Sequence, residues 1–137
     1  MSALAKKTNI LTLRGQKRKK IKTVLVTAYD IWQAKLADQA GVDAILVGDS
    51  LGMTTLGHET TIPVTMDDMI RHTDAVRKGT KNAFLIGDMP YLSYQISNEE
   101  AIRNAGRFVR SGVDCVKVEG AMVNRIKALC DAGFVVM

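Results

Sequence analysis

Three acidic residues each follow a short apolar run of the sequence. Asp49 comes after AILVG, Asp88 after FLIG and Glu119 after CVKV. If these runs are parallel strands, their carboxyl ends meet at one rim, and the three carboxylates converge there. Carboxylates held together repel one another unless a cation balances them, and all-oxygen ligands favour Mg²⁺ or Mn²⁺ over zinc. The pattern predicts a divalent metal site, although each acid alone is also explained as a turn, cap or solvated residue.

Two further polar residues stand close to these acids. Lys117 lies two positions before Glu119, so strand alternation points both side chains to the same side of the sheet. We expect its ammonium group to bind a substrate carboxylate or to offset the acidic charge; a lysine lying outward between helices is the alternative. Ser50 has no nucleophile-elbow context, so we expect its hydroxyl or amide to orient a ligand.

Other polar residues give weaker evidence of a functional role. Asp30 is expected to cap a helix and His72 to lie on a helix surface, while His58, in a long loop, could contact a ligand. The sequence carries no P-loop, dinucleotide-binding glycine motif, zinc motif or glycosidase-like acid pair. Cys115 and Cys130 lack metal-ligand spacing and are interpreted as buried, reduced thiols of a cytosolic protein.

The elements that must position these residues follow a strand-helix rhythm. Strands are expected at Thr23–Tyr29, Ala44–Gly48, Phe84–Gly87, Cys115–Val118 and Phe134–Met137. Helices are expected at Ile31–Ala40, Met66–Lys78, Asn98–Arg110 and Ala121–Ala132. Most strands are apolar on successive residues, as is typical of strands covered on both faces. The rhythm predicts an α/β fold with a parallel sheet and outer helices. The second strand is followed by a loop of about sixteen residues, where roughly 4–6 is usual.

Composition and charge set the class of protein. The chain has 137 residues, 47% hydrophobic and 24% charged, and a net charge of +5. Residues 1–22 hold eight of its nineteen lysines and arginines and no acid, so the remainder is mildly acidic. Such a leader can bind nucleic acid or an anionic surface; we favour a solvated leader with a short helix at Thr8–Leu13, and neither a nucleic-acid nor a membrane partner. No run is long enough for a membrane span, and we expect a cytoplasmic protein, or a mitochondrial one if the leader is a transit segment.

Four segments closely resemble those of the ketopantoate hydroxymethyltransferase family, also called 3-methyl-2-oxobutanoate hydroxymethyltransferases. They read VTAYD at 26–30, LVGDSLGMTTLGHETTIPVTMDDMIRHTDAVRKG at 46–79, GDMPYLSY at 87–94 and VKVEG at 116–120. The likeness spans about residues 22 to 137, and the long GDS-loop motif is highly specific.

The resemblance implies a Mg²⁺-dependent, homo-oligomeric TIM (β/α)₈ barrel of pantothenate biosynthesis. Such an enzyme transfers a hydroxymethyl group from the folate 5,10-methylenetetrahydrofolate to the 2-keto acid 3-methyl-2-oxobutanoate, through a Mg-stabilised enolate, and gives 2-dehydropantoate. By this resemblance Asp49, Asp88 and Glu119 are the metal group. Asp49, Ser50, Asp88 and Lys117 would contact the keto acid, and the long loop would close over the ligand.

The length of the chain departs from this family pattern. A (β/α)₈ barrel takes about 250 residues, so we expect a partial barrel: a basic leader at 1–22, and at 23–137 the N-terminal half, with four βα units and a fifth strand. The family's general base is expected beyond Met137, and the sequence offers no substitute catalytic residue. Whether the isolated chain is active stays open. The alternatives are a Mg-dependent lyase of the phosphoenolpyruvate mutase type and a non-catalytic half-barrel assembly module, which two unpaired sheet edges would favour.

Overall fold

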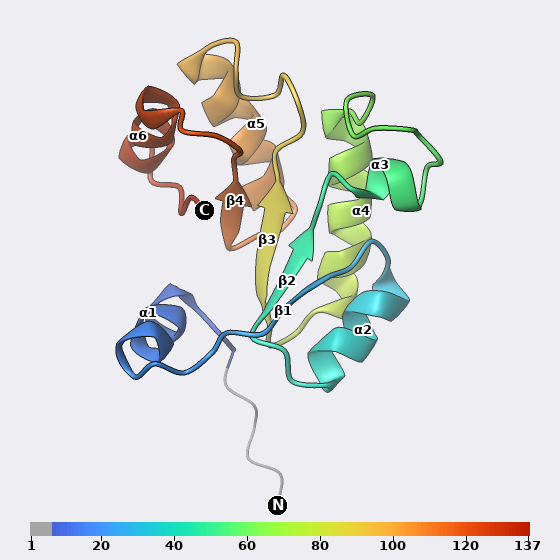
Figure 1. The fold of residues 1–137 in the computed structure, drawn as a ribbon, viewed down its shortest axis with the longest axis vertical. Helices are drawn as coiled ribbons and strands as arrows, with labels where there is room; N and C mark the ends of the chain where they lie inside the picture. The colour runs from blue at the N-terminus through green and yellow to red at the C-terminus, as the bar shows by residue number, and fades with distance from the viewer. Residues whose placement is uncertain (1–6) are drawn as a thin grey trace, which may run out of the picture.

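Helices alternate with short parallel strands along the described chain, except that two helices, α3 and α4, stand between β2 and β3 (Figure 1). The computed structural model describes residues 7–137; the first six residues of the expected leader lie outside this range. The helices are α1 (Ile10–Arg18), α2 (Ile31–Gln39), α3 (Leu51–Thr54), α4 (Met66–Gly79), α5 (Asn98–Arg110) and α6 (Val123–Asp131). The strands are β1 (Leu25–Thr27), β2 (Ala44–Val47), β3 (Phe84–Asp88) and β4 (Cys115–Lys117).

The four strands form one parallel sheet in the order β1-β2-β3-β4. Each strand lies beside the next one in the chain, without the reversal of order that marks a doubly wound sheet. Right-handed crossovers then place the connecting helices on one face of the sheet, as in a barrel wall. The predicted parallel α/β sheet is confirmed.

The predicted fifth strand is reduced to a single bridge between Val116 and Val136. Its backbone still lies along β4, because the Met137 N–H donates to the carbonyl oxygen of Val116 at 2.9 Å and the Val118 N–H donates to that of Met137 at 3.1 Å. Phe134–Met137 therefore follows the sheet edge without completing a ladder.

Polar caps fix where the helices begin. The Asp30 carboxylate accepts hydrogen bonds from the N–H groups of Trp32 and Gln33, both at 2.8 Å, which confirms its predicted role as the cap of α2. Thr65 and Asp68 form a reciprocal capping box at the start of α4. The segment after Asp49, expected to be a continuous loop, contains the one-turn helix α3, so the carboxylate is followed almost at once by a packed turn.

The main core lies between the sheet and the helices α2, α4 and α5. Leu85 of β3, Val76 of α4 and Phe108 of α5 are fully buried there. The ring of Phe108 packs so closely on Gly87 that a Cβ built on the glycine would lie 2.4 Å from the Cδ1 atom of Phe108. A residue without a side chain is thus required just before Asp88.

The other face of the sheet is partly covered by α1, which lies across the sheet from α2 and α4 (Figure 1). Ile10 and Leu13 pack against a second apolar cluster, whose buried members are Ala44, Phe84, Ile86 and Cys115. Both cysteines are free thiols, but only Cys115 is buried as predicted; Cys130 is exposed, because α6 turns its neighbour Leu129 to the core instead. The short helix expected at Thr8–Leu13 begins later and runs on to Arg18, and it packs on the sheet rather than being wholly solvated. The domain boundary at residue 22 stays a prediction.

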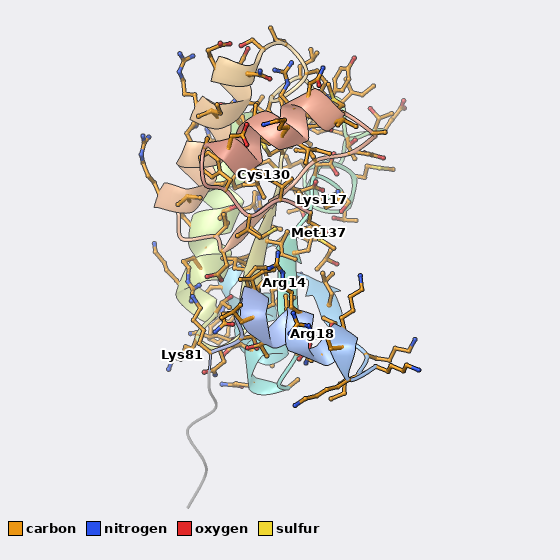
Figure 2. The ribbon with its side chains drawn as sticks, turned by 90° about the vertical axis from the view of Figure 1, so that its left-hand side faces the viewer. Arg14, Arg18, Lys81, Lys117, Cys130 and Met137 are labelled. Carbon is orange, nitrogen blue, oxygen red and sulfur yellow. The ribbon has the colours of Figure 1, made fainter. Side chains whose placement is uncertain are left out.

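This second face remains open beside α1. An apolar groove of about 220 Å³ runs from Ile10 and Leu25 to Val136 and Met137. Figure 2 views this side, with Arg14 and Arg18 of α1 below Met137. All three residues of β1 are exposed, so this edge strand is not covered on both faces as its apolar sequence predicts. No helix within residues 7–137 has the length and apolar character needed to cross a membrane.

Candidate functional site

Asp88 stands at the centre of the candidate site, at the carboxyl end of β3. Asp88 is 4% exposed, and each of its carboxylate oxygens accepts a hydrogen bond. The ammonium Nζ of Lys117 donates to Oδ1 at 2.7 Å, and the backbone N–H of Asp49 donates to Oδ2 at 3.2 Å. Asp88 and Lys117 are register partners in neighbouring strands, which places their side chains on the same side of the sheet. The sheet itself thus brings the carboxylate and the ammonium group together.

Burial shapes the ionisation of this pair. Loss of hydration raises the pKa of Asp88 above its ordinary value of 3.8, although the hydrogen bond and charge of Lys117 oppose the shift. For Lys117, burial disfavours the charged form, but the hydrogen bond and charge of Asp88, with the charges of Asp49 and Glu119, raise its pKa above 10.5. The ammonium group is therefore held charged beside a carboxylate that is costly to ionise.

The three acids predicted from the sequence line one cavity. Asp49, Asp88 and Glu119 contribute to the wall of a cavity of about 260 Å³, together with residues of two neighbouring loops: Thr61, Ile62, Met89, Tyr91, Tyr94, Gln95 and Gly120. They come from the carboxyl ends of β2, β3 and β4, the rim at which the sequence placed them. Burial decreases across the set, from buried Asp88 through half-buried Asp49 to exposed Glu119.

These carboxylates do not form a closed metal cage. Within residues 7–137, no three His, Cys, Asp or Glu side chains are grouped closely enough to hold an ion together. The two carboxylate oxygens of Asp88 each accept one hydrogen bond, from Lys117 and from the Asp49 N–H. The donor chemistry nevertheless fits Mg²⁺, which needs few protein carboxylates and keeps water or substrate oxygens as its other ligands.

Ser50 lies in a chain of contacts that the sequence did not reveal. The hydroxyl groups of Tyr29 and Ser50 are 2.8 Å apart. The backbone carbonyl of the same tyrosine accepts a hydrogen bond from Nδ1 of His72 at 2.6 Å, so this histidine is half-buried against the end of β1 rather than free on the helix surface. His58 does not line the cavity; its backbone N–H donates to the carbonyl of Gly52 at 2.8 Å.

Tyr94 is the second tyrosine that sequence reasoning missed. Its phenol oxygen accepts a hydrogen bond from the Glu119 N–H at 3.0 Å and donates to the Glu119 carbonyl at 3.3 Å. The residue lies in the loop between β3 and α5, where no periodic pattern marks a buried side chain. Tyr91 directly follows the motif GDMP and Tyr94 comes three positions later, and the sequence does not indicate which of the two rings is buried.

Comparison with known proteins gives the same family for almost the whole chain. The family model described as ketopantoate hydroxymethyltransferase matches residues 7–137. The 3-methyl-2-oxobutanoate hydroxymethyltransferase of Alkaliphilus metalliredigens (strain QYMF) is 53% identical over 137 residues, which cover 98% of this chain and 49% of the relative. The protein of the same name from Geobacillus kaustophilus (strain HTA426) is 61% identical over 113 residues, 80% of this chain and 40% of the relative. The chain therefore spans half or less of the length of these relatives.

Solved structures with little sequence similarity share the fold. A phosphonopyruvate hydrolase aligns with a TM-score of 0.76 at 18% identity, over 94% of this chain and 50% of that chain. A phosphoenolpyruvate phosphomutase from Streptomyces platensis subsp. rosaceus aligns with a TM-score of 0.72 at 19% identity, over 93% of this chain and 52% of that one. These similarities confirm the predicted partial (β/α)₈ barrel. At identities this low they are evidence about the fold and not about the function.

The site residues lie inside the matched region. Asp49, Asp88, Lys117 and Glu119 all fall within residues 7–137, and the segments that carry them come together in space as the ends of neighbouring strands. The model match and relatives at 53% and 61% identity agree. This chain belongs to the ketopantoate hydroxymethyltransferase family.

Proposed function

We propose that this chain supplies the keto-acid and metal half of a 3-methyl-2-oxobutanoate hydroxymethyltransferase site. The reaction transfers a hydroxymethyl group from 5,10-methylenetetrahydrofolate to 3-methyl-2-oxobutanoate and gives 2-dehydropantoate. The observation that carries the proposal is the single cavity lined by Asp49, Asp88 and Glu119 in a chain that the family model matches over residues 7–137. A homo-oligomeric assembly and a cytoplasmic location stay predictions.

The three carboxylates are proposed to hold Mg²⁺ with few direct contacts. Bound there, the ion would supply positive charge beside the 2-keto group of the substrate, which acidifies the C3 proton and stabilises an enolate. Asp49 is half-buried and Glu119 is exposed, and neither carboxylate has a recorded partner within residues 7–137. These two side chains are therefore the ones able to turn toward an ion without breaking an existing ion pair.

Lys117 is proposed to bind the carboxylate of the keto acid. Its ammonium group has three N–H donors, and the bond to Asp88 uses one of them. Lys117 is not part of the cavity wall, but its side chain is 30% exposed, so a donor remains accessible to a ligand. Asp88 then has two tasks: it holds the lysine charged and, through the Asp49 N–H, fixes the backbone that leads to Ser50.

Ser50 is proposed to orient the keto acid by its hydroxyl group. The contact with the Tyr29 hydroxyl fixes the direction of the Ser50 side chain at the rim. We assign no general base among residues 7–137. The described residues are therefore expected to bind the keto acid without removing its C3 proton at an appreciable rate.

Isothermal titration of 3-methyl-2-oxobutanoate into the purified chain tests this proposal, with and without Mg²⁺. We expect binding that strengthens when Mg²⁺ is added, and a loss of at least about tenfold in that Mg²⁺ effect for Asp49→Asn and for Glu119→Gln. The matched control is Asp74→Asn, which removes an exposed acid of α4 outside the cavity. Keto-acid binding that is the same with and without Mg²⁺ would contradict the metal assignment.

Proton exchange separates binding from turnover. In D₂O, NMR of the C3 proton of the keto acid should show negligible exchange by the purified chain even when Mg²⁺ is present. Rapid exchange would show that a base lies within this chain and would overturn the assignment of binding groups only.

A further inference from the structure

The backbone of Glu119 lies outside the sheet. Strand β4 ends at Lys117, and Val118 makes the last bond to the neighbouring segment, from its N–H to the Met137 carbonyl at 3.1 Å. Gly120 then turns the chain away with φ +87°, a left-handed conformation that suits glycine. Helix α6 begins at Val123 without a side-chain cap. Neither the strand nor the next helix therefore holds the peptide groups of Glu119.

Tyr94 supplies the support that the sheet does not. Its hydroxyl group is the only recorded hydrogen-bond partner of both the N–H and the carbonyl of Glu119 within residues 7–137. One phenol oxygen thus binds both peptide groups of the residue, at 3.0 Å and 3.3 Å. The contact joins the loop after β3 to the turn after β4.

Tyr94 is held in place by the buried part of the loop that carries it. Tyr94 is 4% exposed, and its neighbour Ser93 is 5% exposed. The side-chain amide of Asn104, on α5, donates to the Ser93 carbonyl at 2.7 Å, and the Ser93 hydroxyl donates to the Pro90 carbonyl at 2.7 Å. The position of the hydroxyl is therefore set by a buried network anchored on a helix, not by a mobile loop.

We propose that Tyr94 is a positioning residue for Glu119: its buried hydroxyl fixes the turn that presents the exposed carboxylate to the cavity. The inference rests on the proposed metal role of Glu119. A fixed backbone restricts where that carboxylate can reach, so a bound ion finds the ligand already in place. Removing the Tyr94 hydroxyl leaves the Glu119 side chain in the protein and affects only the backbone that positions it.

Tyr94→Phe removes both hydrogen bonds and keeps the ring. We expect the Glu119 amide proton to exchange with solvent roughly fivefold to tenfold faster, as the loss of one ordinary hydrogen bond implies, while the buried Leu85 amide stays protected. Mn²⁺ titration followed by electron paramagnetic resonance should show affinity weakened by about ten- to a hundredfold. The matched control is Thr23→Val, which likewise removes one side-chain hydroxyl hydrogen bond, to Gln16, but lies outside the cavity; it should change neither quantity.

The outcomes separate this inference from the proposed function. A folded Tyr94→Phe protein with unchanged Glu119 exchange and unchanged Mn²⁺ affinity would overturn the positioning role. If the wild-type protein binds no Mn²⁺, the proposed metal role fails, and the exchange of the Glu119 amide still decides the role of Tyr94. If Tyr94→Phe does not fold, wild-type exchange decides: a Glu119 amide that exchanges at least about fivefold more slowly than an unprotected amide supports the inference, and one that exchanges as fast as an unprotected amide overturns it.

Discussion

The Lys117 ammonium group lies 2.7 Å from Oδ1 of Asp88, and the two residues face each other as register partners of β3 and β4. The carboxylate is buried, and the lysine is the only cation recorded within bonding distance of it in residues 7–137. Removing the lysine would leave a buried negative charge without a partner. The Asp88 carboxylate therefore needs a positive partner. A divalent metal ion could supply positive charge in place of the lysine.

The first prediction concerns Lys117→Met. Breaking a buried ion pair costs about 3–5 kcal/mol, but this lysine side chain is 30% exposed, so we expect a loss of about 1–3 kcal/mol in the free energy of unfolding. Added Mg²⁺ should restore more stability to this variant than it adds to the wild type. Urea unfolding with and without Mg²⁺ measures both effects. Lys127→Met, which removes an exposed ion pair with Asp131, should cost under about 1 kcal/mol.

The second prediction concerns the pH dependence of stability. Burial raises the pKa of Asp88 above 3.8, so the folded protein holds this proton more tightly than the unfolded chain does. Stability contributed by Asp88 is therefore greatest below its unfolded pKa and falls as the pH rises through the raised folded pKa. Asp88→Asn removes this titration. The difference in unfolding free energy between wild type and Asp88→Asn should fall from about pH 4 upward; a difference that grows over this range would show that the folded pKa is lowered instead.

The third prediction concerns two glycines with opposite surroundings. In Gly87→Ala the new methyl group would meet the Phe108 ring at 2.4 Å, so we expect a loss of about 1–3 kcal/mol in unfolding free energy. In Gly106→Ala, within α5, the new Cβ would meet no atom within 4 Å beyond its chain neighbours and the backbone of its own helix, so we expect a gain of up to about 1 kcal/mol. Thermal unfolding of both variants checks the pair. Phe108→Leu in the Gly87→Ala background should recover part of the loss, and a failure to do so would point to a cause other than the ring.

The positions of the acids were predictable from the sequence because strand ends in a parallel sheet share a rim. Asp49, Asp88 and Glu119 each follow a recognisable apolar run, so their common cavity follows from topology alone. The partner of Lys117 was only partly predictable. The alternation of side chains along a strand predicted on which side of the sheet the lysine lies. Its direct pairing with Asp88 depends on the register of β3 and β4, which no local sequence pattern encodes.

The features missed from the sequence share a physical cause: they depend on contacts between distant segments. Helix α1 was expected to belong to a solvated basic leader, yet Ile10 and Leu13 pack it on the sheet. Tyr29 and Tyr94 bind Ser50 and Glu119, which are 21 and 25 residues away in the chain. Helix α3 is a single turn within a glycine-rich segment and is too short to show a period.

The fourth prediction concerns Tyr29, whose hydroxyl group contacts that of Ser50 at 2.8 Å. If Ser50 orients the keto acid, Tyr29→Phe should weaken keto-acid binding about twofold to tenfold, the effect of one ordinary hydrogen bond, with little change in unfolding free energy. Titration calorimetry of Tyr29→Phe, Ser50→Ala and the double variant measures the coupling. Because Tyr29 would act through Ser50, the double variant should bind no more weakly than Ser50→Ala alone. Fully additive losses would mean that the Tyr29 hydroxyl contacts the ligand by itself or holds another part of the rim.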